Sequence, residues 1–301
     1  MRIFIFLLLA ILTYSSCSDD GSSAQALRLE QSIKVQGIVR TFLINLPGDY
    51  YDNDADRALV IGLHGAGGSG LQFEKDYELQ TKVNGAGAIA VFPDGVNSTG
   101  PLKLRFWNAG NCCDYSMEQN IDDVGFIRTL LTHLTDTYRI DESRIFVAGM
   151  SNGGMFAYRL ACEMSERFAA IAVVSGTLMV SEPCDATTPV PVLHLHSIKD
   201  EKVPFAGGKG LGGYNYTPVE LSVQTWSAIN GCAQPMAEED YGLYSVFRSE
   251  GCLAPVQLYV TEDGGHAWPG SKKARHAADE PSVAINGNDV IWNFFSEHVH
   301  E

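Results

Sequence analysis

Residues 144–161 have the sequence RIFVAGMSNGGMFAYRLA, and this stretch decides the fold. The run Arg144–Ala148 is typical of a buried strand, and the residues from Gly153 onward favour a helix. Between them, Gly149-Met150-Ser151-Asn152-Gly153 matches G-x-S-x-G, which predicts a nucleophile elbow in this context. The turn is so sharp that Ser151 must adopt a strained conformation, and side chains at the two flanking glycines would clash.

Short apolar runs recur along the chain, as expected for strands buried on both faces of a parallel sheet. The predicted strands are 58–63, 88–92, 144–148, 169–174, 190–195 and 256–260. The predicted helices between and after them are 123–138, 153–164, 219–230 and 289–298. This order predicts an α/β fold, with a mainly parallel sheet and helices on both faces, and the elbow at Ser151 is typical of the α/β-hydrolase fold. Residues 32–46 alternate with a period of two around Gly37, which predicts an antiparallel N-terminal hairpin.

A serine hydroxyl becomes a good nucleophile only beside a base, which is commonly a histidine held by a carboxylate. In this kind of fold the three residues follow the chain order Ser, Asp, His. Asp200 lies five residues past Leu195, where a predicted strand ends, and His266 lies six residues past Val260, where the next one ends. Loops at the carboxyl ends of parallel strands share one crevice, so we expect Ser151, Asp200 and His266 to form a catalytic triad.

Other acids and histidines are weaker candidates. Asp263 is closer to His266 in sequence, but it lies in the same turn and could hardly orient the ring from behind. Asp122 and Asp123 precede a predicted helix, so we expect capping rather than acid–base chemistry from them. Structural roles, such as a bond to a neighbouring carbonyl, are expected for the histidines near strand ends, which are His64, His194 and His196.

An oxyanion hole needs two backbone N–H donors. One is expected from Asn152, which follows the candidate nucleophile. The other is expected from the loop in LHGAGGSG, after the strand at 58–63, with Ala66 as the first choice and Gly67 as the alternative. This loop lacks the lysine of a phosphate-binding P-loop and the spacing of a dinucleotide-binding motif, so no cofactor is predicted.

The N-terminus, MRIFIFLLLAILTYSSC, has one basic residue, an apolar run and small residues before Cys17. This pattern predicts a signal peptide at residues 1–16, because the run is too short to span a membrane. A cysteine after small residues resembles a bacterial lipoprotein box, so Cys17 is the predicted lipidation site. An ordinary signal peptide with a chance cysteine is the alternative. Residues 17–27 are expected to form a flexible tether, and residues 28–301 a single catalytic domain.

The chain has 7 cysteines, which leaves an even number after Cys17 and indicates disulfides in an exported protein. Cys232 and Cys252 flank a predicted hairpin and are the best single pair. Cys112 and Cys113 are adjacent and are expected to bond elsewhere, because a vicinal bridge strains the backbone. No C-x-x-C pair or compact Cys/His cluster favours zinc, so no metal site is predicted.

The net charge of −15 on 301 residues indicates a surface that repels phosphate backbones. A nucleic acid is therefore excluded as a partner. Contact with a membrane is expected only through the lipid anchor. With the anchor, the protein is expected in the periplasm or at the cell surface, and without it the protein is expected to be secreted. Two long loops, 201–218 and 270–281, are expected beside or over the site.

Several longer motifs occur in order between residues 28 and 298. They are HGAGG, FPDG, RFWNAGNCCD, IDDVGFI, GMSNGGMFAYRLAC, WSAINGC and GGHAWPG. In these motifs the chain resembles the polyhydroxybutyrate depolymerase and feruloyl esterase group of α/β-hydrolases, near carbohydrate esterase family 1. The resemblance implies the same triad of Ser151, Asp200 and His266. In HSIKD the chain departs from the family's His-Gly-Thr-x-Asp, so that Ser197 replaces a glycine while Asp200 keeps its offset.

The resemblance implies a serine esterase that forms an acyl-enzyme and acts on feruloylated or acetylated polysaccharide fragments. Trp107, in a segment that resembles the family's site-lining loop, and Trp268, two residues after His266, are the expected substrate contacts. A depolymerase of polyhydroxybutyrate or another short-chain polyester is the main alternative, although no polymer-binding domain is visible. A serine peptidase of the same fold is a further alternative, but it would usually carry an extra propeller or cap domain. An inactive binding lipoprotein is the last alternative, but it would not need an intact elbow, acid and base.

Overall fold

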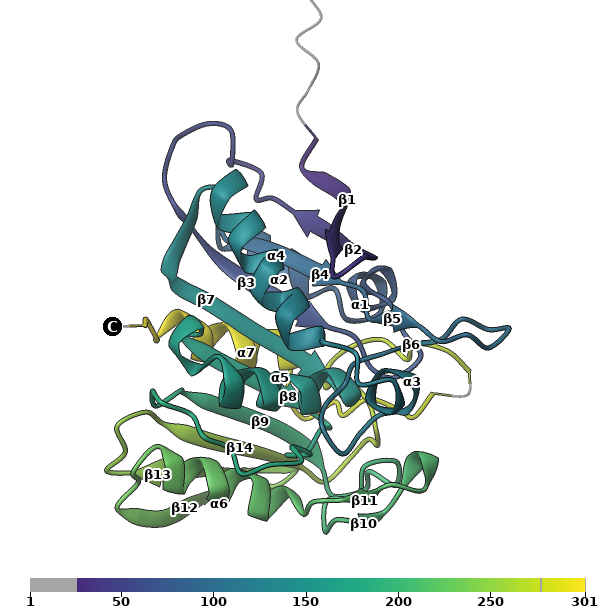
Figure 1. Cartoon of the computed structure of the whole chain (residues 1–301). Helices are drawn as coiled ribbons and strands as arrows, with labels where there is room; N and C mark the ends of the chain where they lie inside the picture. Colours follow the sequence, from purple (N-terminus) through teal and green to yellow (C-terminus); the bar gives the residue numbers. More distant parts are fainter. Residues whose placement is uncertain (1–25, 277, 301) are drawn as a thin grey trace, which may run out of the picture.

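The computed structural model describes residues 26–276 and 278–300 and is built around a ten-stranded sheet (Figure 1). The central strands run parallel to one another in the order β4, β3, β7, β8, β9 and β14. Their bounds are β3 Arg57–Leu63, β4 Ile89–Pro93, β7 Ile140–Met150, β8 Ala170–Val174, β9 Val192–Ser197 and β14 Val256–Thr261. Each coincides with a predicted strand, because a continuous apolar run can be buried on both faces of a sheet.

An antiparallel hairpin extends the sheet at each edge. At one edge β1 (Arg28–Val35) pairs with β2 (Ile38–Asn45), and β2 pairs with β4. At the other edge β13 (Tyr244–Glu250) lies between β14 and β12 (Gln234–Asp240). The structure therefore confirms both hairpins that the sequence predicts.

Helices cover both faces of the sheet, as the sequence predicts. Helices α4, α5 and α6 pack on one face, and α1, α2 and α7 pack on the other. The bounds are α1 Gly70–Tyr77, α2 Leu79–Gly85, α3 Asp114–Glu118, α4 Asp123–Thr137, α5 Asn152–Glu163, α6 Val219–Ile229 and α7 Gly287–Ser296. The sequence analysis did not predict α1, α2 and α3, because helices of eight residues or fewer carry too little periodic pattern.

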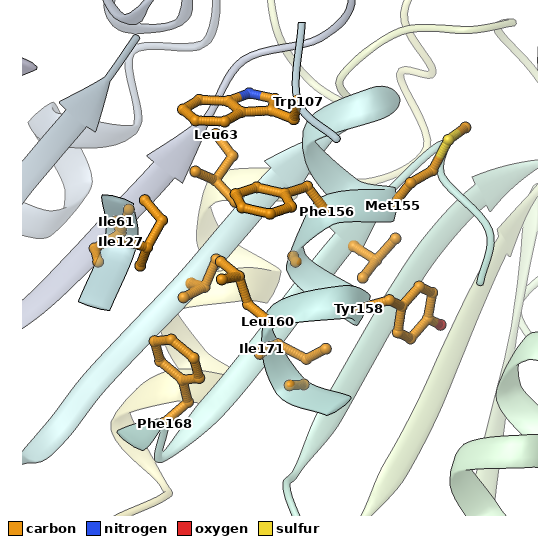
Figure 2. Packing of buried hydrophobic residues seen from close by; sticks show 14 of the residues in the cluster. Ile61, Leu63, Trp107, Ile127, Met155, Phe156, Tyr158, Leu160, Phe168 and Ile171 are labelled. Atoms are coloured by element: carbon orange, nitrogen blue, oxygen red, sulfur yellow. The ribbon is translucent and has the colours of Figure 1, made fainter. Parts of the chain in front are cut away.

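The core beneath α5 fixes this helix on the sheet. Figure 2 shows Phe156 and Leu160 of α5 among Ile61 and Leu63 of β3 and Ile171 of β8. All five side chains are fully buried. The first turn of α5, which follows Ser151, is therefore held at a set place above the carboxyl end of β7.

Asp122 and Asp123 have different roles at the start of α4. Asp122 caps the helix, since its carboxylate accepts the N–H of Gly125 at 2.8 Å. Asp123 is buried and accepts instead from the Arg40 guanidinium at 2.7 Å and from the Asn108 N–H at 2.8 Å. The capping prediction is thus right for Asp122 and wrong for Asp123, because an arginine distant in sequence meets it in the core.

Three disulfides join the six cysteines of the described residues. Cys232 is bonded to Cys252 across the β12–β13 hairpin, as the sequence predicts. Cys162, near the end of α5, is bonded to Cys184. The expectation that Cys112 and Cys113 bond elsewhere is wrong, because the structure joins them to each other.

The predicted signal peptide and the predicted lipidation site, Cys17, lie outside the described residues. Within the described part of the chain, no helix combines the length and the apolar content needed to cross a membrane. Short elements gather in the loops on the right of Figure 1, and they include α3. The strands among them are β5 Val96–Asn97, β6 Arg105–Phe106, β10 Gly208–Lys209 and β11 Asn215–Tyr216.

Candidate active site

Ser151 lies at the turn from β7 into α5 and has φ 56° and ψ −121°, a strained conformation for a residue with a side chain. A Cβ at Gly149 would overlap the carbonyl of Gly153, and a Cβ at Gly153 would overlap the carbonyl of Leu63. The two glycines are therefore required by the close passage of the backbone, as the sequence predicts.

Three loops bring Ser151, His266 and Asp200 into contact. The Ser151 Oγ lies 2.8 Å from the His266 Nε2, and the His266 Nδ1 lies 2.7 Å from the Asp200 Oδ2. A carboxylate can only accept, so the Nδ1 carries the proton and the Nε2 is free to accept from the serine hydroxyl. This arrangement can transfer the hydroxyl proton to the imidazole while the oxygen attacks an electrophile.

The Asp200 carboxylate is buried and fully hydrogen-bonded. Its Oδ1 accepts the N–H groups of Lys202 at 2.9 Å and Val203 at 2.8 Å. Burial by itself would raise the pKa of Asp200, but hydrogen bonds from His196 and His266 outweigh it and hold the pKa well below its ordinary value. Asp200 therefore stays ionised and can orient the imidazole of His266.

The rival acid, Asp263, is committed to other partners. Its carboxylate accepts the hydroxyl of Ser282 and, at 2.7 Å, the N–H of Val283. These bonds fix the end of the 270–281 loop. The structure therefore pairs His266 with Asp200 and not with Asp263.

Backbone N–H groups lie where an oxyanion hole is expected. Asn152 is the first residue of α5, and the first N–H groups of a helix have no intrahelical acceptor. Ala66 lines the same cavity as Ser151, and within the described ranges its N–H has no acceptor. The alternative donor, Gly67, is already bonded to the Arg105 carbonyl at 2.7 Å. The geometry thus favours Ala66 over Gly67.

A cavity of about 360 Å³ opens beside Ser151 and His266. Phe73, Tyr77 and Trp268 form an aromatic wall of it, in which only Tyr77 is partly exposed, since Phe73 is 0% and Trp268 is 1% exposed. Both long loops contribute to it, the first through Lys202 and Leu211 and the second through several residues, which are Ser271, Lys272, Ala274, Arg275, Ala278, Asp279 and Pro281. The cavity has the size and the mixed lining of a small-molecule site.

Nothing in the described ranges suggests a metal centre beside this cavity. Among residues 26–276 and 278–300, no three His, Cys, Asp or Glu side chains lie close enough together to hold a metal ion.

A model of the phospholipase/carboxylesterase family of α/β-hydrolases matches residues 51–219. This range is more than half of the chain and contains Ser151 and Asp200. The chain is a member of that family. Membership in this family of phospholipases and carboxylesterases makes it a carboxylic ester hydrolase.

Relatives of this esterase carry the name feruloyl esterase. A protein of Aspergillus clavatus, named probable feruloyl esterase C, is 30% identical over 269 residues, which cover 85% of this chain and 83% of that one. Feruloyl esterase C of Emericella nidulans is 29% identical, with the same shares covered. The solved acetyl xylan esterase of Aspergillus awamori has the same fold, with a TM-score of 0.61 and 17% identity over 89% of this chain and 99% of that one.

The structure buries both tryptophans that were expected to contact substrate, and of the two only Trp268 lines the cavity. Trp268 is 1% exposed, stacks on Tyr77 with the ring centroids 4.9 Å apart and donates its indole N–H to the Asn288 side-chain oxygen at 2.9 Å. Trp107 is 0% exposed, stacks on Phe156 and donates its indole N–H to the His64 carbonyl at 3.0 Å (Figure 2). The prediction for Trp107 is therefore wrong, because its ring belongs to the core of the esterase.

Trp107 supports the site through its backbone instead. Its N–H donates to the Asn152 side-chain oxygen at 2.8 Å, and its carbonyl accepts from the Asn152 amide at 2.9 Å. The side chain of Asn152 thus holds a second loop against the start of α5. Sequence reasoning assigned Asn152 only a backbone role, because a side chain's distant partner leaves no local pattern.

Sequence reasoning also missed Asp279, which ties the acid loop to the base loop. Its carboxylate accepts the backbone N–H of His266 at 2.9 Å and the ammonium of Lys202 at 3.1 Å. Ser197, the residue that departs from the family pattern, adds a bond from its hydroxyl to the Gly264 carbonyl at 3.1 Å. These contacts restrain the loop that carries His266 from both sides.

His64 holds the loop of Ala66 in place. Its Nε2 accepts the N–H of Gly95 at 3.0 Å, and its Nδ1–H donates to the Gly65 carbonyl at 2.8 Å. Burial lowers the pKa of His64 to about 4, so the ring is neutral at physiological pH. A structural role, through a neighbouring carbonyl, is what the sequence led us to expect for this histidine.

We expect the esterase to lose stability as the pH falls from about 6.5 to 4. The unfolded chain binds a proton on His64 below its ordinary pKa of 6.5, whereas the folded chain resists it until about pH 4. The unfolded state therefore binds more protons in this window, at a cost of about 3 kcal/mol for His64 alone. Burial also lowers the pKa of His194 well below its ordinary value, which adds to the loss.

Urea denaturation at about pH 7.5 and at about pH 4.5 measures this effect. The variant His64→Gln serves as the control and should show a shallower fall in the free energy of unfolding between the two conditions. An unfolding free energy that is equal at both pH values would show that the buried histidines are not coupled to folding.

Proposed function

We propose that this esterase is exported and hydrolyses feruloyl or related esters on plant polysaccharide fragments. The contact of Ser151 with His266 at 2.8 Å, and of His266 with Asp200 at 2.7 Å, is the observation that carries the proposal. The names of the curated relatives support the feruloyl ester as the substrate class.

The reaction begins when the Ser151 oxygen attacks the ester carbonyl and the His266 Nε2 accepts the hydroxyl proton. The ionised Asp200 orients the imidazolium that forms. The N–H groups of Ala66 and Asn152 stabilise the oxyanion of the tetrahedral intermediate.

The intermediate collapses when His266 returns the proton to the alcohol, which leaves an acyl group on Ser151. A water molecule then attacks the acyl-enzyme. His266 accepts a proton from that water and returns it to Ser151 as the acid departs, so the free esterase is restored.

The aromatic wall beside Ser151 suits a planar phenolic acyl group. Tyr77 and Trp268 stack on each other with an interplanar angle of 15°, so Trp268 backs the partly exposed ring of Tyr77. Flat rings and the apolar faces of sugars both pack well on aromatic rings. We propose that the substrate packs on this pair, on Tyr77 and on the part of Trp268 that lines the cavity.

Export is supported by the disulfides and by the N-terminal sequence. Three disulfides are typical of proteins that fold in an oxidising compartment. The sequence of residues 1–17 has the pattern of a signal peptide that ends before a cysteine for lipidation. We propose that the mature esterase starts at Cys17 and is anchored by lipid in the periplasm or at the cell surface.

Three substrates test the proposal. Purified esterase is incubated with methyl ferulate, acetylated xylan and a polyhydroxybutyrate film, and the released acid is measured. We expect hydrolysis of methyl ferulate, with acetylated xylan as the second substrate, because the cavity has an aromatic wall and the named relatives are feruloyl esterases. Degradation of the polyester film alone would show that the carbohydrate assignment is wrong.

A further inference from the structure

A chain of buried polar side chains continues behind Asp200, on the side away from His266. The Tyr158 hydroxyl lies 2.7 Å from the His194 Nδ1, and the His194 Nε2 lies 3.0 Å from the His196 Nδ1. The His196 Nε2 lies 2.9 Å from the Val203 carbonyl and 3.4 Å from the Asp200 Oδ2. Tyr158, His194 and His196 are each 1% exposed or less, so the chain is buried along its whole length.

The direction of the hydrogen bonds follows from their ends. The Val203 carbonyl and the Asp200 carboxylate only accept, so the His196 Nε2 carries a proton. A neutral His196 then accepts at its Nδ1 from the His194 Nε2–H, and His194 accepts at its Nδ1 from the Tyr158 hydroxyl. In this arrangement every donor points toward Asp200.

The opposite arrangement leaves a donor unsatisfied. If His196 carried two protons, His194 would accept from it and would donate to the Tyr158 oxygen. Within the described part of the chain the Tyr158 hydroxyl has no second partner, so its own proton would have no acceptor. Burial raises the pKa of Tyr158 and lowers that of His194, so Tyr158 keeps its proton and His194 stays neutral. Buried polar groups are rarely left without a partner, which favours the first arrangement.

These hydrogen bonds connect the helix that follows Ser151 with the strand that leads into Asp200, in addition to the contact through His266. Tyr158 belongs to α5, the helix that follows Ser151, and Figure 2 shows its hydroxyl pointing away from Phe156 and Leu160. His194 and His196 belong to β9, which leads into Asp200. A closed ring of contacts therefore runs from Ser151 through α5 and β9 to Asp200, and through His266 back to Ser151.

We infer that Tyr158, His194 and His196 form a positioning chain that fixes the Asp200 carboxylate for His266, and this inference rests on the catalytic roles proposed above. The His196 Nε2 bonds the Val203 carbonyl and also lies close to the Asp200 carboxylate. His196 therefore holds the turn that carries Asp200. A displacement of about 1 Å in such a group can lower the rate of catalysis by about 10²-fold. Fully satisfied buried networks of this kind hold their members in one geometry.

Variants of His196 test the chain. His196→Leu fills the space without a donor, whereas His196→Gln keeps an N–H near the position of the ring Nε2. We expect His196→Leu to lower kcat on methyl ferulate by about 10- to 10²-fold, with KM changed by less than about threefold. We expect His196→Gln to recover at least a third of the wild-type kcat.

Leu134→Ala is the matched control, since Leu134 lies on α4 and is buried outside both the hydrogen-bonded chain and the cavity lining. It loses stability through a cavity, yet its kcat, measured well below its melting temperature, should stay within about threefold of wild type. If Leu134→Ala loses as much kcat as His196→Leu, the effect is general loosening and the inference fails. If His196→Leu does not fold, Tyr158→Phe takes its place, and a kcat no lower than that of Leu134→Ala overturns the inference.

A measurement without turnover separates this inference from the proposed function. The Nδ1–H of His266 in its bond to Asp200 gives a downfield proton resonance in the NMR spectrum. We expect this resonance to shift or broaden in His196→Leu and in Tyr158→Phe, and to stay in place in Leu134→Ala. This result would support the chain even if no ester were hydrolysed. An unchanged resonance in folded His196→Leu and Tyr158→Phe would overturn the inference, even if hydrolysis were normal.

Discussion

Replacing Ser151 with alanine is expected to lower kcat by at least about 10⁴-fold on every ester that the protein hydrolyses. The variant lacks the only oxygen that lies 2.8 Å from the His266 Nε2 within the described residues, so no acyl-enzyme can form. The fold should persist, because the alanine Cβ occupies the place of the serine Cβ and the strained backbone is held by Gly149 and Gly153. Kinetics on methyl ferulate and a thermal denaturation curve measure both effects.

A buried serine outside the site provides the control for Ser151→Ala. The Ser222 hydroxyl is fully buried, accepts the N–H of Leu178 at 3.0 Å and donates to the Pro218 carbonyl at 3.1 Å. Ser222→Ala should lose some stability and keep its activity within about threefold, because Ser222 does not line the cavity. Ester hydrolysis by Ser151→Ala within about tenfold of wild type would rule out the proposed nucleophile.

Asp123→Ala is expected to cost about 3–5 kcal/mol of unfolding free energy, the largest loss that we predict for stability. The Asp123 side chain is 0% exposed and that of Arg40 is 4% exposed, with the two charges 2.7 Å apart. Burial raises the pKa of Asp123 and lowers that of Arg40, so each charge depends on the other to remain ionised. The variant leaves the guanidinium buried against Phe126 without its paired carboxylate and leaves the Asn108 N–H without its acceptor.

Two further variants make this result specific. Asp122→Ala removes a helix cap one residue away and should cost only about 1 kcal/mol. Replacing Arg40 and Asp123 together with leucine should cost less than Asp123→Ala, because no unpaired charge remains. Urea denaturation of the three variants measures the differences. A loss for Asp123→Ala no larger than that for Asp122→Ala would show that water or another group replaces the lost partner.

The fold and the three side chains in contact at the site could be predicted because their signals are local. Gly149 and Gly153 are required by a backbone that passes within contact distance of itself, and the motif therefore appears as five consecutive residues. Asp200 and His266 follow the ends of apolar strands, and parallel strands end at one edge of a sheet. The apolar strands and the chain order were together enough to predict that these distant residues meet in one crevice.

Other features could not be predicted, because they depend on partners that are distant in sequence. Asp123 has the sequence position of a helix cap, yet its carboxylate is buried and pairs with Arg40, which is 83 residues away. Trp107 lies in a segment that resembles a site-lining loop, but its ring fills a space between Phe126 and Phe156. Neither outcome leaves a pattern in the residues beside it.

The sequence by itself determined the order of the central strands and of the longer helices, the elbow at Ser151 and the acid and base that follow it, since these depend on apolar periodicity and on steric limits within a few residues. Only the tertiary structure decided which side chains support them. Asp279, the side chain of Asn152 and the chain from Tyr158 to His196 all act through hydrogen bonds between segments that meet only after the sheet has formed. A hydrogen bond can join residues at any distance along the sequence. Its donor and acceptor could therefore be identified only after the fold had brought the two residues together.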